Sequence, residues 1–388
     1  MKIVPQFDIK KIEDYKVIIK NFDLQKKFFN KYINNCIRVK SCPICNDTNF
    51  ENIAPLYRQF LFYDFKENDK NLKHYFNNIK FQLNNEQLAM CKNCGLIFSN
   101  CNYDYNFFLD YMQIEDGADP SIYDENLLSI DKYYGLAKHN ARVKKIFNLK
   151  FYTKFFFSKI LNKFFSIKKS KFLEVSSYRS WALDKLNYWF DVYGIEPNYV
   201  SVKFSNNKFP HLSKKIKNNL FELEENNLLS ENKFFDIILF SMCFRHMQNP
   251  YKSLEIIEKI TSKDSIVIID ESEYLDSVIN KINTQEINLE NLSNFFLHGK
   301  MFYYSKIHII YLMNKYSFQL TDEYETKDNK YPNLTQSTMI FKKNNKNMTK
   351  DFNEEFRKNY QNVKVLNENL DILSKFKNSK ELMLFSIE

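Results

Sequence analysis

The stretches Phe172-Leu173-Glu174-Val175 and Asp191-Val192-Tyr193-Gly194-Ile195-Glu196 decide the fold of this chain. Each is a short apolar run, and the segment between them, Trp181 to Trp189, has a helical pattern. Similar apolar runs recur further along the chain, with helical patterns at 250–260 and 306–316 between them. These later runs are Asp236–Phe240, Ser265–Asp270, Phe318–Leu320 and Ser337–Phe341. Continuous apolar strands that alternate with helices are typical of an open parallel α/β sheet with helices on both faces.

Two short cysteine pairs precede this region, Cys42-Pro-Ile-Cys45 and Cys91-Lys-Asn-Cys94. The two-residue gap lets both thiolates of a tight turn reach one ion, and two such turns supply a tetrahedral Cys₄ zinc site. Gly95 directly follows the second pair and permits the positive φ that such a turn needs. The alternative is two pairs of ordinary buried thiols. We expect the other three cysteines to be unpaired small apolar residues, namely Cys36, Cys101 and Cys243.

The bulk composition is that of a folded protein. With 388 residues, 44% hydrophobic and 17% aromatic, the chain can bury a core and form two domains, or one large domain with an appendage. Its net charge of +9 comes from lysines spread along the whole chain, so a nucleic-acid-binding zinc protein is the least favoured function. We expect no membrane span, because no long uninterrupted apolar run occurs. Zinc-type cysteine spacing without a signal-peptide pattern predicts a cytoplasmic location.

The patterns divide the chain into five parts. We expect a helical lead-in at 1–40, a small zinc-binding domain at 41–102, a helical linker at 103–170, the α/β domain at 171–342 and a helical tail at 343–388. The segment 146–171 places lysines at near-helical spacing among phenylalanines. Such a helix could lie on an anionic membrane surface, or it could be a linker helix that packs its phenylalanines on the next domain.

Glu196 ends the second predicted strand, roughly 20 residues after Glu174 at the end of the first, which is the interval of dinucleotide-type sites. Nucleotide-like ligands bind at the carboxyl ends of the strands of such sheets. Glu196 is therefore placed to accept hydrogen bonds from a ribose diol. The alternative is a solvated carboxylate at a strand end.

At this point the chain resembles class I S-adenosylmethionine-dependent methyltransferases that carry an N-terminal zinc-binding domain, among them sugar C-methyltransferases acting on nucleotide-linked deoxysugars. The resemblance covers residues 41 to 342. It rests first on the two cysteine pairs, the second of which is followed by Gly95-Leu96-Ile97-Phe98, and on the two opening strands, the second of which is followed by Pro197. A third motif is Phe235-Asp236-Ile237-Ile238, followed by Arg245-His246 and Asn249-Pro250. The last is the stretch His298-Gly299-Lys300-Met301-Phe302-Tyr303-Tyr304-Ser305.

The resemblance implies a Rossmann-like sheet, S-adenosylmethionine as cofactor, structural zinc and a sugar-like small-molecule acceptor. It implies that His298 and Tyr303 act as base or orienting residues and that His246 lines the site. Only the first histidine of the family's His-Glu-His stretch is matched, since Gly299 and Lys300 replace the rest. The cofactor-binding residues that it implies are Glu174, Ser176, Ser177, Glu196 and Ser241.

The loop after the first strand departs from the family pattern. The family has a glycine-rich loop there, whereas this chain has Ser176-Ser177-Tyr178-Arg179-Ser180-Trp181. Glycine adopts positive φ cheaply, and no residue of this loop offers that freedom. Either the turn is reshaped and the cofactor is held mainly by Glu196 and later loops, or the site has lost its cofactor. The second case would make the chain a non-catalytic binding or scaffolding protein on a methyltransferase frame.

Overall fold

The structure is a computed structural model. It describes residues 30–32, 36–56, 58–64, 75–81, 86–115, 169–230, 234–271, 274–284, 301–327, 335–344 and 351–369. Most of the expected lead-in, nearly all of the Phe-rich segment 146–171, and the stretch His298-Gly299-Lys300 lie outside these residues. In the described part of the chain, no helix combines the length and apolarity needed to cross a bilayer.

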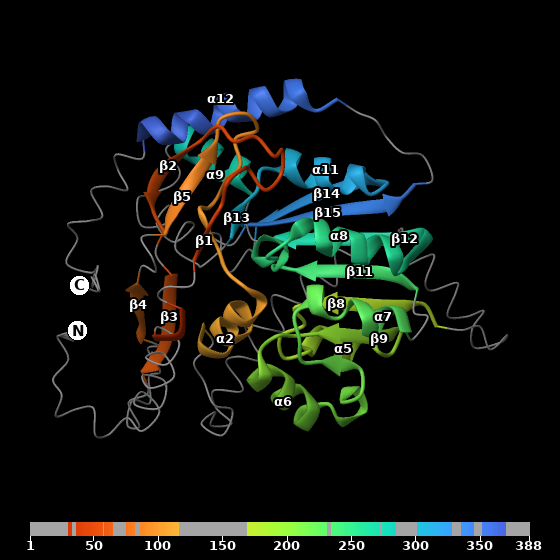
Figure 1. Cartoon of the computed structure of the whole chain (residues 1–388). Coiled ribbons are helices and arrows are strands. Elements are labelled where there is room, and N and C mark those ends of the chain that lie inside the picture. Colours follow the sequence, from red (N-terminus) through yellow and green to blue (C-terminus); the bar gives the residue numbers. More distant parts are fainter. Residues whose placement is uncertain are drawn as a thin grey trace, which may run out of the picture.

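A seven-stranded sheet forms the body of the molecule (Figure 1). Its order is β10-β9-β8-β11-β12-β15-β14. The strands are β8 (Lys171–Val175), β9 (Asp191–Ile195), β10 (Ile216–Lys217), β11 (Phe235–Ser241), β12 (Thr261–Glu271), β14 (Phe318–Lys327) and β15 (Thr335–Lys343). Strands β10 to β12 are parallel, and β15 runs antiparallel to both β12 and β14. The predicted α/β fold with a Rossmann-like sheet is confirmed. The expectation that the sheet is parallel throughout is wrong at one edge, because β15 follows β14 as an antiparallel hairpin partner and also runs antiparallel to β12. The short β10 was not predicted.

Both faces of this sheet are buried, which is why its strands read as continuous apolar runs. Alternate residues of a strand point to opposite faces. On one face Phe172, Ile237 and Ile268 pack against α5 (Trp181–Leu186) and α6 (Tyr199–Lys208). On the other face Leu173, Ile238 and Ile269 share a core with α8 (Pro250–Lys259) and α11 (Lys306–Lys315).

The cysteine-bearing segment forms a second, four-stranded sheet in the order β13-β6-β5-β2. Its strands are β2 (Phe50–Pro55), β5 (Gln87–Cys91), β6 (Ile97–Ser99) and β13 (Phe302–Tyr303). Strand β13 comes from far along the chain and pairs with β6. The helices α9 (Leu275–Asn283) and α12 (Asn353–Asn369) pack on this sheet through Val278 and Val363. The cysteine module is thus built partly from residues of the α/β region.

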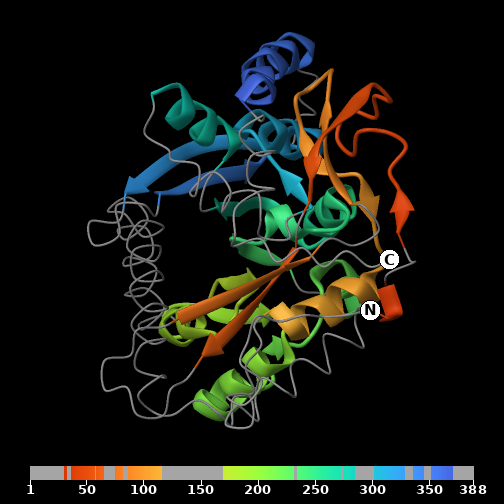
Figure 2. The ribbon, with the colours of Figure 1, turned by 90° about the vertical axis from the view of Figure 1, so that its left-hand side faces the viewer.

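The remaining elements are short. They are β1 (Ile37–Arg38), β3 (Arg58–Asp64), β4 (Tyr75–Phe81), β7 (Cys101–Asn102), α2 (Tyr105–Glu115), η3 (Pro210–Leu212), η4 (Phe221–Leu223), α7 (Glu225–Ser230) and η5 (Phe244–His246). Strands β3 and β4 form a separate antiparallel pair. Helix α2 lies beside α6 in both views (Figure 1, Figure 2).

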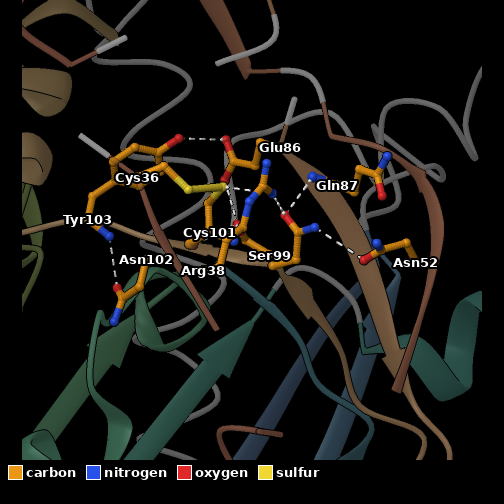
Figure 3. The surroundings of a disulfide bond; sticks show 10 residues. Cys36, Arg38, Asn52, Glu86, Gln87, Ser99, Cys101, Asn102 and Tyr103 are labelled. Carbon is orange, nitrogen blue, oxygen red and sulfur yellow. Dashed lines mark hydrogen bonds between the residues drawn. A yellow bond between two sulfur atoms is a disulfide. The ribbon is translucent and has the colours of Figure 1, made fainter. Parts of the chain in front are cut away.

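One cysteine prediction is wrong. Cys36 and Cys101, expected to be unpaired, form a disulfide across 65 residues of sequence (Figure 3). The cause is the antiparallel pairing of β1 with β7, which sets Arg38 opposite Cys101. The Arg38 side chain donates to Asn100 at 2.9 Å beside the bond. Cys243 is buried, as expected of a small apolar residue, and burial raises the pKa of its thiol well above the usual value.

Candidate functional site

The four cysteines of the two pairs converge on one point. Their sulfur atoms all lie within 4.8 Å of one another. Cys42 Sγ is 3.6 Å from Cys94 Sγ, and Cys45 Sγ is 3.5 Å from Cys91 Sγ. Metal–sulfur bonds of about 2.3 Å in a tetrahedron put the sulfurs slightly less than 4 Å apart. The spacing of these four thiols therefore fits a tetrahedral metal ion.

The two cysteine turns have the same hydrogen-bond pattern. In the first, Cys42 N donates to Asp47 O at 2.7 Å, and Asn46 N donates to Cys42 O at 3.0 Å. In the second, Cys91 N donates to Leu96 O at 2.9 Å, and Gly95 N donates to Cys91 O at 3.0 Å. The residue after each pair is left-handed, with φ of 59° at Asn46 and 75° at Gly95. Asparagine and glycine are the residue types that tolerate this conformation best.

Helices of the α/β region hold both turns from outside. The Tyr251 hydroxyl on α8 donates to Ile44 O in the first turn. On the second turn, Asn359 Nδ2 of α12 donates to Cys94 O at 2.7 Å, and His308 Nε2 of α11 lies 3.0 Å from the same oxygen. A Cβ on Gly95 would lie 2.9 Å from the backbone of Tyr360, so α12 packs directly on this turn.

His308 is a buried support of the cysteine cluster and not a ligand. Its Nδ1 accepts from Ser305 N at 3.0 Å, so the proton is on Nε2, which donates to Cys94 O. Burial lowers the pKa of His308 to about 4, which keeps the ring neutral. At the cluster itself, hydrogen bonds among the thiols lower the pKa of Cys45 and Cys91 and raise the pKa of Cys42 and Cys94, so the four groups share their protons unevenly. Thiolates are the form that binds metal.

A second polar site lies at the carboxyl ends of β8 and β9. The loop after β8 is left-handed at every second residue, with φ of 60° at Ser176, 48° at Tyr178 and 57° at Ser180. Each non-glycine residue in this conformation costs about 1–2 kcal/mol. The chain therefore makes a turn of the kind that glycine favours, although Ser176, Tyr178 and Ser180 occupy its left-handed positions.

Glu196 holds this loop in its conformation. Tyr178 N donates to Oε2 of Glu196 at 2.6 Å, and Asn198 N donates to Oε1 at 2.8 Å. The carboxylate is 4% exposed, so both bonds are shielded from water. Ser176 N adds a bond to Ile195 O at 2.8 Å. The turn is thus not reshaped as expected: it keeps left-handed angles without glycine, and Glu196 holds it in place.

Gly194 lets the loop lie close to β9. A Cβ at this position would lie 2.8 Å from both Leu183 Cδ1 and the Ser177 hydroxyl oxygen. Any larger residue would push the loop and α5 away from the strand. The loop after β8 has no glycine of its own, and Gly194 in the neighbouring strand β9 leaves the space that the loop needs.

The expected cofactor residues come together at this edge. Glu174 is fully buried in β8 next to the loop that holds Ser176 and Ser177. Ser241 ends β11 and faces Asp270 in register. The end of α2 lies over the same edge, because Asn198 Nδ2 donates to Met112 O at 2.7 Å. Sequence reasoning missed this helix contact, since no pattern links Met112 to a turn far along the chain.

The residues expected to act in catalysis lie in three different settings. His246 is half-buried at the end of η5, in the turn after β11. Tyr303 lies in β13, 2% exposed, in the apolar cluster that joins the cysteine sheet to α9. His298 is outside the described residues.

Four buried polar residues at the ends of β11 and β12 were not predicted. They are Arg245, Glu271, Tyr274 and Tyr304. Two of them directly neighbour predicted site residues, since Arg245 precedes His246 and Tyr304 follows Tyr303. Successive residues of a strand point to opposite faces, so only one ring of the pair Tyr303-Tyr304 can face the carboxyl edge of the main sheet. This alternation could have suggested Tyr304 as an alternative to Tyr303.

Comparisons with known proteins agree with the α/β region being a methyltransferase domain. Residues 150–323 match a family model described as a methyltransferase domain. This match supports a methyltransferase domain in that part of the chain. No curated protein matches the sequence significantly.

Two solved structures illustrate the structural likeness. The N-methyltransferase NodS from Bradyrhizobium japonicum WM9, in complex with S-adenosyl-L-homocysteine, is 9% identical, and the alignment covers 47% of this chain and 83% of that one with a TM-score of 0.34. A SAM-dependent methyltransferase from Aquifex aeolicus is 16% identical, with 52% and 96% covered and a TM-score of 0.29. Likenesses of this size add nothing to the family match.

Ser176→Gly should stabilise the protein. The substitution removes a left-handed strain of about 1–2 kcal/mol, partly offset by the greater chain entropy that glycine has in the unfolded state. Ser176→Ala is the matched control, because it keeps the strain. We expect Ser176→Gly to exceed Ser176→Ala by about 1 kcal/mol in the free energy of unfolding, measured by urea titration. Equal stability of the two variants would contradict the left-handed conformation.

The disulfide and the expected zinc ion should be coupled. In the chain-entropy model, Cys36→Ser opens a loop spanning 65 residues and costs about 4 kcal/mol when no metal is bound. A zinc ion that joins the two cysteine turns already closes most of this loop. With zinc bound, Cys36→Ser should therefore lower the free energy of unfolding by about 1 kcal/mol less than it does without metal. Urea unfolding of wild type and Cys36→Ser, with zinc and with chelator, measures the difference. Equal losses in both conditions would show that no metal joins the turns.

Proposed function

We propose that this chain is an S-adenosylmethionine-dependent methyltransferase that acts on a sugar-like small molecule, with structural zinc in the cysteine module. The observation that carries the proposal is the loop at 176–180. It lies at the carboxyl end of β8, next to β9, where such sheets bind nucleotide-like ligands. It keeps a left-handed, glycine-like course without glycine, at a cost of several kcal/mol. Strain retained in this way is typical of functional sites.

The residues at this edge fit the cofactor. Glu174, Ser176 and Ser177 would line its path along the end of β8, and Ser241 would face it from β11. Glu196 has a double task in this proposal. A carboxylate can accept about four hydrogen bonds, so the bonds from Tyr178 N and Asn198 N do not prevent a contact with a ribose hydroxyl. Losing Glu196 would therefore affect both the ribose contact and the shape of the loop.

Bound S-adenosylmethionine would supply an activated methyl group. The tasks left to the protein are to hold the acceptor in line and to remove its proton. His298, Tyr303 and His246 are the predicted groups for this second task. Of these, His246 lies in the turn that follows β11, which supports its choice as a lining residue.

The zinc ion would be structural. All four ligand positions of the site are cysteines, so no open position remains for a substrate or a reactive water. The ion would lock together two turns that α8, α11 and α12 also hold through Ile44 O and Cys94 O. We further propose a cytoplasmic location on the strength of the zinc-type cysteine spacing, although the Cys36–Cys101 disulfide counts against it, because disulfides are rare in a reducing compartment.

Calorimetry with S-adenosylmethionine tests the proposal. Wild type should bind, and Glu196→Gln should bind at least tenfold more weakly, about 1.4 kcal/mol. Glutamine offers one carbonyl oxygen, so one of the two backbone N–H groups would face an amide donor instead. Glu225→Gln is the control, since Glu225 pairs with Lys252 and Lys259 away from the site.

Two results would count against the proposal. If wild type shows no binding at millimolar S-adenosylmethionine, the enzyme function is excluded and a non-catalytic protein on this frame is the better account. If wild type binds and Glu196→Gln binds equally well, the role given to Glu196 is wrong.

A further inference from the structure

Arg245, Glu271, Tyr274 and Tyr304 form a buried polar cluster at the carboxyl ends of β11 and β12. Their exposed fractions are 9%, 2%, 1% and 4%. Glu271 is the last residue of β12, and Arg245 lies in η5 just after β11. The Arg245 Nε is 3.2 Å from Glu271 Oε2, and its backbone N–H lies 3.4 Å from Oε1. The ion pair thus ties the two strand ends together.

The backbone brings the two tyrosines to this pair. Met301 N donates to Arg245 O at 3.2 Å, and Leu275 N donates to Tyr304 O at 2.8 Å. The segment Met301–Tyr304 therefore runs from the turn of Arg245 to the start of α9, where Tyr274 is the N-cap residue. The Tyr304 ring packs on Phe244, the neighbour of Arg245, with ring centres 5.8 Å apart.

Several polar atoms of this cluster have no hydrogen-bond partner among the described residues. They are Nη1 of Arg245, whose Nε is already paired with Glu271, and the hydroxyl groups of Tyr274 and Tyr304. Leaving such a group buried and unsatisfied costs about 1–3 kcal/mol. Folded proteins rarely keep several of them side by side, and a bound ligand that supplies the missing partners is one physical reason to do so.

The unsatisfied groups share one chemical character. Burial, and after it the charge of Glu271, raise the pKa of Tyr274 and Tyr304 well above the usual value, so both phenols keep their protons. Arg245 can only donate. The positive charge of Arg245 is balanced by Glu271. The cluster therefore offers hydrogen-bond donors without net charge, and it suits a neutral ligand rich in oxygen acceptors.

The cluster adjoins the edge assigned to the cofactor. Ser241 at the end of β11 pairs in register with Asp270, the residue before Glu271. Cys243, in the turn after β11, donates its thiol hydrogen to Val175 O at the end of β8, at 3.4 Å. These contacts join the ends of β8, β11 and β12 into one continuous edge.

We propose that Arg245, Tyr274 and Tyr304 bind the methyl acceptor through its hydroxyl or carbonyl oxygens, and that the bound end of the acceptor is an uncharged, oxygen-rich group such as a sugar ring. The inference rests on the proposed methyltransferase function and names the acceptor-binding residues of that same site. Glu271 acts as a positioning residue, since it fixes the guanidinium of Arg245.

Tyr274→Phe and Tyr304→Phe test the inference in the full-length protein. Each removes one unsatisfied hydroxyl, so the melting temperature of the ligand-free protein should rise by about 1–3 °C. Saturation-transfer NMR with 6-deoxy-D-glucose should show binding to wild type, and the signal should fall at least tenfold in both variants. D-glucuronate, the charged counterpart, should give no comparable signal. Tyr316→Phe is the control, because Tyr316 lies at the far end of α11, about 15 Å of helix from Ser305.

The outcomes separate the inference from the function on which it rests. A lower melting temperature in both variants would show that the hydroxyls have protein partners, and would overturn the inference. An unchanged saturation-transfer signal of 6-deoxy-D-glucose in the two variants would also overturn the inference. The same holds if wild type binds D-glucuronate and not the neutral sugar. Calorimetry with S-adenosylmethionine on the same samples decides the proposed function by itself, and the two Phe variants should bind it as wild type does.

Discussion

The carboxylate of Glu196 is the constraint on which the site depends. Its two oxygens accept the backbone N–H groups of Tyr178 and Asn198, which tie the loop after β8 to the start of α6. Through the side chain of Asn198 the same connection reaches the end of α2. A glycine-rich loop needs no such support, because glycine adopts left-handed angles cheaply. Here the cost of three left-handed side chains is offset by short, buried, charge-assisted bonds.

The cysteine module and the α/β sheet are joined by a shared segment of the chain and by hydrogen bonds. Strand β13 completes the cysteine sheet and continues directly into Tyr304 at the carboxyl edge of the main sheet. His308 follows one helical turn after Ser305 and reaches back to Cys94 O. A metal ion bound by the four cysteines would therefore stabilise the segment that carries Tyr304, without itself touching a substrate. This gives a structural metal a direct physical connection to the proposed acceptor site.

Much of this architecture is visible in the sequence, and the exceptions have physical reasons. The strands β8, β9, β11, β12 and β15 are continuous apolar runs because both of their faces are buried, and a pattern of that kind is read easily. The cysteine turns are local, so their spacing alone predicts the cluster. The Cys36–Cys101 disulfide, the pairing of β13 with β6 and the packing of α12 on Gly95 join segments far apart in the chain, which a single sequence does not reveal. The role of Glu196 as a support for the loop was missed because its partners are backbone groups.

Hydrogen exchange measured by mass spectrometry, with and without S-adenosylmethionine, tests the central claim most directly. The account predicts that peptides covering 176–181 and 196–198 already exchange slowly in the free protein, because Glu196 holds their amides, and that both gain further protection when the cofactor is added. Rapid exchange in the free protein, or protection by the cofactor elsewhere and not in these peptides, would contradict the account.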